Sequence, residues 1–340
     1  MTPCVGFAAE EILSTPSSAS PGPWWKMRVR LSSTNKYDLM KGQVNRMLIS
    51  AKLNKSVKIY RNCPSAVELT KDEICNFHEQ GYLLLPKITT SEEVAWIREI
   101  YDRLFEQRVG WDSGDFFDFA GIDDIETTAI LPQLMSPSRY VPALRKTTFR
   151  ANAYEIAKQL LGKSAELVFE HAMLKPAGTG GETPWNQDEA FYRKYTNYQA
   201  ITFWMPLQSV NSSNGCLEFI PSSHKGPLLP HRSINNDPRI HGLEADGVDA
   251  SQLVACPLPA GGASIHHSRT LHHSGANRSD EPRRAYALGF AVRSRKFTLR
   301  KDLPWNAEKA TAREKRATEA KTTVQHCVNY LKNTAKAILR

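Results

Sequence analysis

The stretch AELVFEHAMLKPAGTGGETPWNQDEAFY, residues 165–192, begins like a β-strand, passes through a glycine-rich turn and ends around a single carboxylate. Its first run is rich in residues that favour strands, and the turn GTGGE separates that run from the segment PWNQDEAFY. Within this segment Asp188 lies between neutral amides and an aromatic run. The pattern fits either a polar loop or a metal site in which one ligand has been changed.

Similar short, strand-like runs follow along the chain and are separated by Gly, Pro, Asn and Ser. They are QAITFWMPL, CLEFIP, QLVACPL, GASIHH and RAYALGF. Repeated short strands without alternating long helices argue against a parallel α/β sheet. The pattern therefore predicts a mainly β protein, a sandwich or a barrel.

Two helices are predicted ahead of the β-rich region, each opened by a capping box. Thr70 with Glu73 opens the first, and Gly81 ends it before the strand-like run YLLLP. Thr90 with Glu93 opens the second, whose apolar residues recur at spacings of three and four and predict packing against a core. These apolar residues are Val94, Ile97, Tyr101, Leu104 and Phe105.

The overall composition is that of a globular protein. The chain has 340 residues, of which 41% are hydrophobic, enough for a sizeable core. No apolar run is long enough for a membrane span, and the acidic, Ser/Pro-rich start does not read as a signal peptide, so we predict a soluble, cytoplasmic protein. The six cysteines include no CxxC pair and are expected to be reduced.

The net charge of +9 is concentrated near the two ends of the chain. Basic residues gather in 26–61 and in 306–340, and the second range predicts a basic amphipathic helix that packs on its own domain. The aromatic-plus-basic pattern of a nucleic-acid reader is missing, so no nucleic-acid partner is predicted. We expect a basic extension (1–65), a β domain (66–297) and a basic C-terminal helix (298–340).

Three chemistry-bearing residues lie far apart in the β-rich region. The carboxylate of Asp188 and the imidazole of His272 can converge on a divalent metal, and a third donor near Asp188 would complete one face of an octahedron. The remaining positions would stay open for substrate and dioxygen. Arg283 follows on the next predicted strand, where its planar guanidinium can bind a carboxylate of a metal-chelating cosubstrate.

Over about residues 68–295 the sequence resembles the phytanoyl-CoA dioxygenase family of non-haem Fe(II)- and 2-oxoglutarate-dependent oxygenases. The likeness is carried by the segments LTKDEICNFHEQGYLLLP, MLKPAGTGGETPWNQDEA, FWMPLQSVNSSNGCLEFIPSSHKG and LHHSGANRSDEPRRAYAL. This resemblance implies a double-stranded β-helix, the jelly roll of cupin-like proteins, with flanking helices.

The resemblance also implies roles for individual residues. Asp188 and His272 would bind Fe(II), and Arg283 would bind the far carboxylate of 2-oxoglutarate. The positions that match the lining of the cosubstrate site are Trp204, Ser274 and His171.

One position departs from the family pattern, in which the metal motif begins as HxD. Asn186 stands where that motif has its first His. An Asn side-chain oxygen can bind a metal, but it is a harder donor than an imidazole nitrogen and less suited to Fe(II). Gln187 is not expected to take its place, because neighbouring residues of an extended segment point to opposite faces. The predicted metal site is therefore Asn186, Asp188 and His272, in which the metal is held more weakly, exchanged for another ion or lost.

Other candidates receive structural interpretations. We interpret His266 and His267 as structural and His224 as a turn histidine. Arg284 is expected to lie at the surface, pointing away from Arg283. The sequence lacks HExxH, which argues against a zinc hydrolase.

The predicted function is that of an Fe(II)- and 2-oxoglutarate-dependent oxygenase that uses O2 to hydroxylate, desaturate or cyclise a small organic metabolite. The carboxylate of Asp188 speaks against a halogenase of this architecture, in which a small residue makes room for halide. The alternative is a catalytically impaired relative that binds a small molecule or acts as a scaffold, and Asn186 motivates it.

Overall fold

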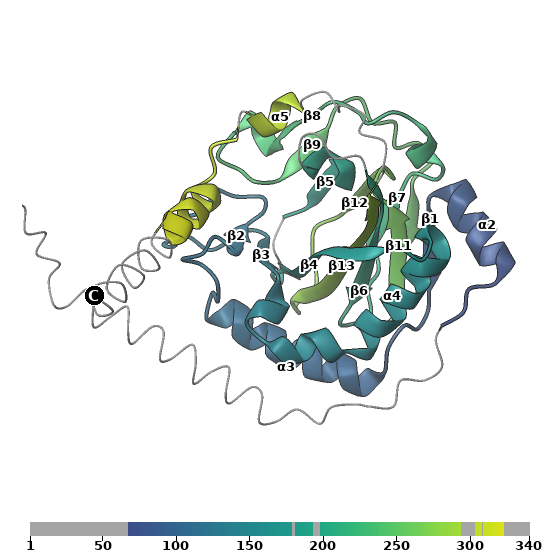
Figure 1. Ribbon diagram of the computed structural model, residues 1–340. Helices are drawn as coiled ribbons and strands as arrows, with labels where there is room; N and C mark the ends of the chain where they lie inside the picture. Colours follow the sequence, from purple (N-terminus) through teal and green to yellow (C-terminus); the bar gives the residue numbers. More distant parts are fainter. Residues whose placement is uncertain (1–66, 179–180, 193–197, 294–302, 308, 323–340) are drawn as a thin grey trace, which may run out of the picture. The chain divides into compact units, whose positions relative to one another are not determined.

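Antiparallel β-strands form the centre of the fold (Figure 1). The computed structural model describes residues 67–178, 181–192, 198–293, 303–307 and 309–322. The predicted N-terminal extension and the predicted helical residues 323–340 lie outside the described residues, so the predicted domain boundaries stay predictions.

The larger sheet has seven strands. In spatial order they are β1 (Tyr82–Leu85), β11 (Ala263–His267), β6 (Tyr198–Pro206), β13 (Arg283–Arg293), β4 (Glu166–Lys175), β3 (Pro132–Met135) and β2 (Phe116–Asp118). A second sheet consists of β10 (Val254–Cys256), β7 (Leu217–Phe219), β12 (His272–Ser274) and β5 (Thr183–Asn186). A short pair is formed by β8 (His231–Ser233) and β9 (Leu243–Ala245). The strand-like runs of the sequence are thus confirmed as strands.

Helices and 3-10 turns connect and flank these strands. The α-helices are α2 (Lys71–Gln80), α3 (Ser91–Glu106), α4 (Thr148–Leu161) and α5 (Pro304–Ala307). The 3-10 turns are η1 (Pro137–Arg139), η2 (Pro142–Lys146), η3 (Asp188–Phe191), η4 (Ser223–Lys225) and η5 (Ile234–Asn236). The helix α4 was not predicted from the sequence. None of the helices described is long and apolar enough to cross a membrane.

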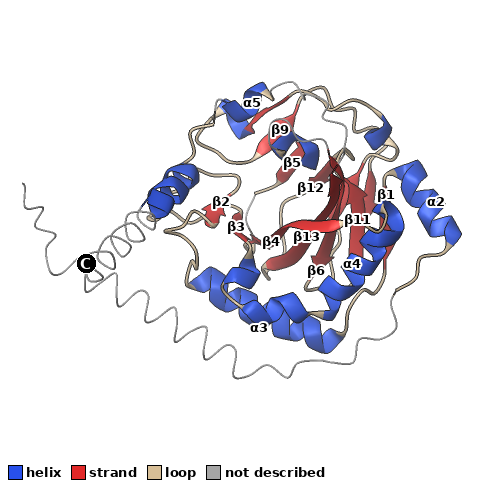
Figure 2. Ribbon diagram, in the orientation of Figure 1, coloured by secondary structure: helices blue, strands red, loops and turns tan. Residues whose placement is uncertain are grey.

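The two larger sheets share one hydrophobic core, which makes the architecture a double-stranded β-helix. Ala285 and Ala287 of β13 pack in a cluster with Leu217 and Phe219 of β7. Because side chains alternate along a strand, Tyr286 points to the other face of β13, where its ring lies 5.4 Å from that of Phe149 in α4. Figure 2 shows α3 and α4 running along the outer side of the strands. The jelly-roll prediction is confirmed.

Arg284 is a correction to the sequence analysis, which placed it at the surface. Its side chain does point away from Arg283, but α3 covers that face of the sheet, and only 8% of Arg284 is exposed. Its guanidinium forms an ion pair with Asp102 of α3. Its backbone N–H donates to Gln208 Oε1 at 2.9 Å. Arg284 therefore anchors α3 to the sheet.

The predicted capping boxes form at one helix but not at the other. Thr70 and Glu73 satisfy each other's backbone N–H groups at the start of α2, and Gly81 ends that helix with φ at 82°. At α3 the Thr90 hydroxyl accepts from Glu93 N–H as predicted. The Glu93 carboxylate, however, accepts from Thr148 N at 2.6 Å and Phe149 N at 2.9 Å, in the first turn of α4. The second capping box is therefore only half formed, because tertiary partners occupy its carboxylate.

This use of Glu93 gives a stability prediction. Glu93→Gln places an NH2 group opposite backbone donors, so we expect a loss of about 2 kcal/mol in the free energy of unfolding, the range for hydrogen bonds to a charged group. The control is Glu99→Gln, which removes only the exposed pair with Arg103 and should cost about 0.5 kcal/mol or less. Urea unfolding curves measure both, and equal losses would show that the Glu93 contacts contribute little.

The described part of the C-terminal segment contacts the β domain, but it is not one continuous helix. After α5, residues 309–311 are not helical, and residues 312–322 form the next helical stretch. Arg316 forms an ion pair of 2.5 Å with the buried Asp123. Lys309 Nζ donates to His241 O at 2.8 Å. These contacts bring basic residues of this segment to the wall of the cavity described next.

Candidate metal and cosubstrate site

A cavity of about 810 Å³ is lined by residues of both larger sheets and of the C-terminal segment. Its volume is typical of a small-molecule site. Every site residue predicted from the sequence lines it: Asn186, Asp188, His272, Arg283, Trp204, Ser274 and His171. The structure therefore brings together residues that lie up to 112 positions apart in the sequence.

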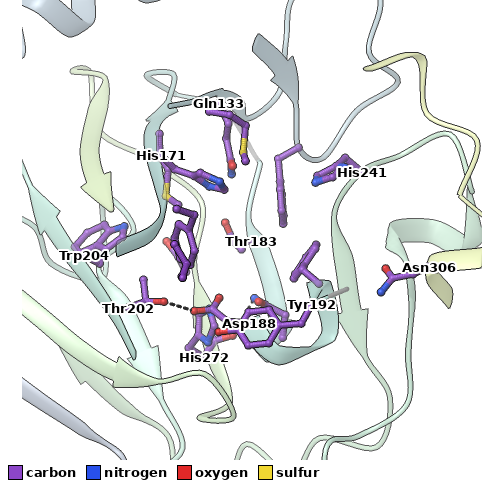
Figure 3. A pocket seen from close by; sticks show the side chains of 18 of the residues that line it. Gln133, His171, Thr183, Asp188, Tyr192, Thr202, Trp204, His241, His272 and Asn306 are labelled. Atoms are coloured by element: carbon purple, nitrogen blue, oxygen red, sulfur yellow. Dashed lines mark hydrogen bonds and ion pairs between the residues drawn. The ribbon is translucent and has the colours of Figure 1, made fainter. Parts of the chain in front are cut away.

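Asp188 is held at the start of η3, directly after β5. The turn is tied to the loop between β11 and β12, because Glu189 N–H donates to Ser268 O at 2.9 Å and the Glu189 carboxylate pairs with Arg269 at 2.9 Å. Thr202 of β6 donates its hydroxyl hydrogen to Asp188 Oδ2 at 2.5 Å (Figure 3). One carboxylate is thus fixed at the cavity wall by neighbours from both sheets.

Two imidazoles face this carboxylate. His272 Nε2, on β12, lies 3.6 Å from Asp188 Oδ1, and His266 Nε2, on β11, lies 3.3 Å from Asp188 Oδ2. The two rings have centroids 4.6 Å apart. One donor atom from each of the three residues lies within 4.8 Å of the others, which makes the trio a possible metal site among the described residues.

The protonation states of Asp188 and His272 suit a metal. Burial raises the pKa of Asp188, but contact with His266 and the nearby imidazoles outweighs burial and holds that pKa well below its ordinary value. Burial lowers the pKa of His272 to about 4, although Asp188 opposes the shift. A charged carboxylate and a neutral imidazole are the forms that bind metal. His272 Nδ1 lies 3.0 Å from Thr270 O, which leaves Nε2 directed toward Asp188.

Asn186 is the last residue of β5 and lies opposite His272 in the strand pair. Its side chain is buried, and its amide nitrogen donates to Pro184 O at 2.9 Å and to His272 O at 3.4 Å. The amide therefore serves the backbone of the two strands. Its oxygen is the atom that remains for the predicted role as a weak third ligand.

His266 differs most from the sequence analysis, which treated it as structural. It is 2% exposed, and neither ring nitrogen makes a hydrogen bond within the described residues. A buried polar group without a partner costs about 1–3 kcal/mol. Strand alternation in β11 predicts that the side chains of Ser264 and His266 lie on the same face. The sequence does not show which residues lie against that face.

Arg283 is a buried cation with unused donors. It is 3% exposed, and its Nε and Nη1 have no hydrogen-bond partner in the described part of the chain. Its Nη2 reaches Ser274 Oγ at 3.4 Å, and its guanidinium lies 5.2 Å from the ring centroid of Trp204. Burial lowers the pKa of Arg283 to about 9, which still leaves it charged at neutral pH.

The neighbour of this guanidinium, Lys175, does not compete for an anion. Its Nζ donates to Ser274 O and Gly275 O, both at 2.7 Å. Burial first, and then the charge of Arg283, lower the pKa of Lys175 to about 6. Near neutral pH, Arg283 is thus the principal positive charge at this end of the cavity.

The cavity also holds residues that the sequence analysis did not single out. Figure 3 shows Gln133 near His171 at one part of the wall, and His241 on the side toward Asn306. Lys309 and Arg313 line the same cavity. Arg313 Nη1 lies 3.4 Å from His241 Nε2. Gln133 comes from β3, His241 from a loop, and Asn306, Lys309 and Arg313 from the C-terminal segment, and no pattern in the sequence indicates that they share a site.

The remaining histidines considered as candidates have other partners. His273 Nδ1 lies 3.0 Å from Glu218, and its ring stacks on Trp185. His267 Nδ1 accepts from Arg269 N at 3.1 Å. His224 belongs to the turn η4, as predicted. The choice of His272 over its neighbour therefore agrees with the geometry.

The polar groups that line this cavity fit a metal ion with a dicarboxylate. A low-pKa carboxylate and two imidazole nitrogens offer a metal three protein donors. The Nε and Nη1 groups of Arg283, which have no partner among the described residues, offer donors for a carboxylate. Both groups line one cavity, so a single small molecule can contact both.

Comparisons with known proteins agree with this geometry. Residues 77–285, more than half of the chain, match the family model described as phytanoyl-CoA dioxygenase (PhyH). A probable alpha-ketoglutarate-dependent hypophosphite dioxygenase of Stutzerimonas stutzeri is 28% identical over 219 residues, which cover 63% of this chain and 76% of that protein. A phytanoyl-CoA dioxygenase of Arabidopsis thaliana is 26% identical over 255 residues, 65% of this chain and 88% of the relative.

A solved structure with a similar fold contains 2-oxoglutarate. EvdO2 from Micromonospora carbonacea var. aurantiaca, complexed with 2-oxoglutarate, is 35% identical with a TM-score of 0.61. The match covers 71% of this chain and 98% of EvdO2.

Proposed function

Because this chain belongs to the phytanoyl-CoA dioxygenase family, whose members depend on Fe(II), 2-oxoglutarate and O2, we propose that it is an oxygenase of this kind acting on a small organic molecule. In this proposal Asp188 and His272 bind the iron, and Arg283 binds the far carboxylate of 2-oxoglutarate. Trp204, Ser274 and His171 line the cosubstrate.

The observation that carries the proposal is the buried guanidinium of Arg283, whose Nε and Nη1 have no partner in the described part of the chain, in the cavity that also holds the carboxylate–imidazole trio. A buried charge without a counter-charge is costly, so a site that keeps one is built for an anionic ligand. A dicarboxylate that also chelates a metal can pair with Arg283 and bind at the metal site at the same time.

Each residue has a task that follows from its environment. Thr202 orients Asp188 through its hydroxyl, and Thr270 O orients the ring of His272. Arg283 positions the cosubstrate, while Trp204 and Ser274 hold the guanidinium itself. When bound, Fe(II) and 2-oxoglutarate supply, with O2, an oxidant that removes hydrogen from a substrate C–H bond.

The substrate part of the cavity combines aromatic and basic side chains. Phe119 and Phe191 line it together with His241, Lys309 and Arg313. This lining favours a molecule with an apolar body and hydrogen-bond acceptors or a negative charge. Hydroxylation is the outcome that we propose, with desaturation and ring closure as the variants of the same hydrogen removal.

The test is consumption of 2-oxoglutarate. Protein loaded anaerobically with Fe(II) and 2-oxoglutarate should form succinate when O2 is admitted, because many such enzymes turn over slowly without substrate. The matched control is the Asp188→Asn protein, which should form none.

The rival function predicts a different result. A catalytically impaired binding protein, the possibility raised by Asn186, would bind metal and 2-oxoglutarate yet leave 2-oxoglutarate intact over many hours and with candidate substrates present. That result would replace the proposed oxygenase by the rival.

A further inference from the structure

His266 is a buried histidine whose Nδ1 has no partner among the described residues, and whose Nε2 lies 3.3 Å from the Asp188 carboxylate without the geometry of a hydrogen bond. A neutral imidazole carries one N–H donor and one acceptor nitrogen, and buried histidines normally satisfy them. The ring faces the cavity, whose lining includes it. A buried imidazole of this kind indicates that a ligand in the cavity binds one of its ring nitrogens.

The position of the ring says which ligand. His266 Nε2 lies 3.3 Å from Asp188 Oδ2, close to the 3.6 Å that separates His272 Nε2 from Asp188 Oδ1. Two donors on adjacent positions of an octahedral ion, with bonds of about 2.1 Å, lie about 3 Å apart. His266 is therefore placed relative to the carboxylate much as His272 is.

Asn186 does not offer the same geometry. Its amide nitrogen is turned to Pro184 O and His272 O, where it joins the ends of β5 and β12. The side chain at position 186 thus has structural partners in the backbone, whereas the ring of His266 makes no hydrogen bond among the described residues and lies 3.3 Å from the Asp188 carboxylate.

We propose that His266 is the third protein ligand of the metal and replaces the imidazole that the family motif has at position 186. The site then keeps two imidazoles and one carboxylate, but one imidazole comes from β11 of the larger sheet instead of β5. This inference rests on the proposed function and deepens it, because it assigns a second imidazole ligand although position 186 has none. It also removes the reason for expecting the metal to be lost.

The first experiment compares metal affinities by anaerobic titration calorimetry with Mn(II), an ion that is stable to oxidation. His266→Phe should weaken Mn(II) at least about 100-fold, the upper end of what even an outer-sphere substitution causes. Asn186→Ala should change the affinity less than about threefold. The opposite ranking of the two variants would overturn the proposal.

A ligand swap makes the test sharper. In the His266→Phe background, Asn186→His should restore Mn(II) binding to within about tenfold of the starting protein, because it returns an imidazole two residues before Asp188. If the folded double variant binds Mn(II) no better than His266→Phe, the missing imidazole is not the cause of the lost affinity, and the proposal fails.

A spectroscopic readout counts the imidazoles directly. With Cu(II) as the probe, nitrogen hyperfine splitting in the electron paramagnetic resonance spectrum should report two coordinated imidazoles in the starting protein and one in His266→Phe. An unchanged count in His266→Phe would refute the assignment. A merely structural histidine would leave both count and affinity unchanged while lowering the unfolding temperature of the metal-free protein.

His266→Gln serves as a second variant if His266→Phe does not fold, and the same loss of Mn(II) affinity is expected. The failures of the two proposals differ. Metal binding that disappears in Asp188→Asn but persists in both His266 variants overturns only the role of His266. Metal binding that ignores Asp188→Asn, or a starting protein that binds neither Mn(II) nor Fe(II), overturns the proposed function as well.

Discussion

Asp188→Asn should abolish metal binding. Asp188 supplies the negative charge of the trio, and its contacts hold the carboxyl group ionised with a pKa well below its ordinary value. Asn keeps the size and the hydrogen bond to Thr202 but removes the charge. We expect Mn(II) affinity to fall by at least about 3 kcal/mol, more than a hundredfold in Kd, on the scale of losing one partner of a buried charge pair.

The matched control is a second carboxylate-to-amide change nearby. Glu182→Gln alters an exposed side chain that lies 3.6 Å from His273, a histidine outside the trio. It should leave the Kd for Mn(II) unchanged in the same calorimetric titration. Thermal unfolding of each metal-free variant reports whether the fold is kept, and a folded Asp188→Asn protein with undiminished Mn(II) affinity would remove Asp188 from the site.

The sequence was sufficient to predict the fold and a set of residues that share one cavity, because the signals were local or were carried by a family pattern. The strand-like run RAYALGF forms β13, whose two faces pack on α4 and on the second sheet. Asp188, His272 and Arg283 line one cavity, as their order in the chain indicated. The family match over residues 77–285 shows why that order was informative.

The sequence is least informative where a side chain's contacts depend on a distant element. Arg284 points away from Arg283, as strand alternation requires, but the sequence does not show that α3 covers that face. Glu93 begins a capping box in sequence, yet the first turn of α4 takes its carboxylate. His266 is one of two adjacent histidines with no spacing that marks a ligand, and only the approach of η3 to β11 puts it beside Asp188.

The position of His266 beside Asp188 changes how the substitution at position 186 is understood. From the sequence alone, Asn186 removes an imidazole from the metal motif, and the site is one donor short. In the folded chain a different imidazole lies 3.3 Å from the same carboxylate. A motif gives ligands by their order, whereas coordination depends on which donors converge, so the loss of a motif residue does not by itself establish the loss of a site.

The second large effect concerns the cosubstrate. Arg283→Leu should weaken 2-oxoglutarate binding to the Mn(II)-loaded protein by about 2–4 kcal/mol, because it leaves a carboxylate of the ligand without its buried counter-charge. Anaerobic calorimetry measures this change as a roughly 30-fold to 1000-fold rise in Kd. The Kd of Arg283→Lys for 2-oxoglutarate should lie between those of the starting protein and Arg283→Leu, since an ammonium keeps the charge but not the planar pair of donors.

Arg284→Leu is the control, and it should differ from Arg283→Leu in its effect on the stability of the ligand-free protein. In the folded protein burial depresses the pKa of Arg283 to about 9, below the ordinary value of an arginine. Folding therefore disfavours the charged form of Arg283 at every pH below that value. Arg283→Leu should therefore leave the ligand-free protein as stable at pH 7 or make it more stable. Arg284→Leu breaks the ion pair with Asp102 and should lower the unfolding temperature while leaving the Kd for 2-oxoglutarate unchanged. Two variants that weaken 2-oxoglutarate equally would show that the cosubstrate is not bound through Arg283.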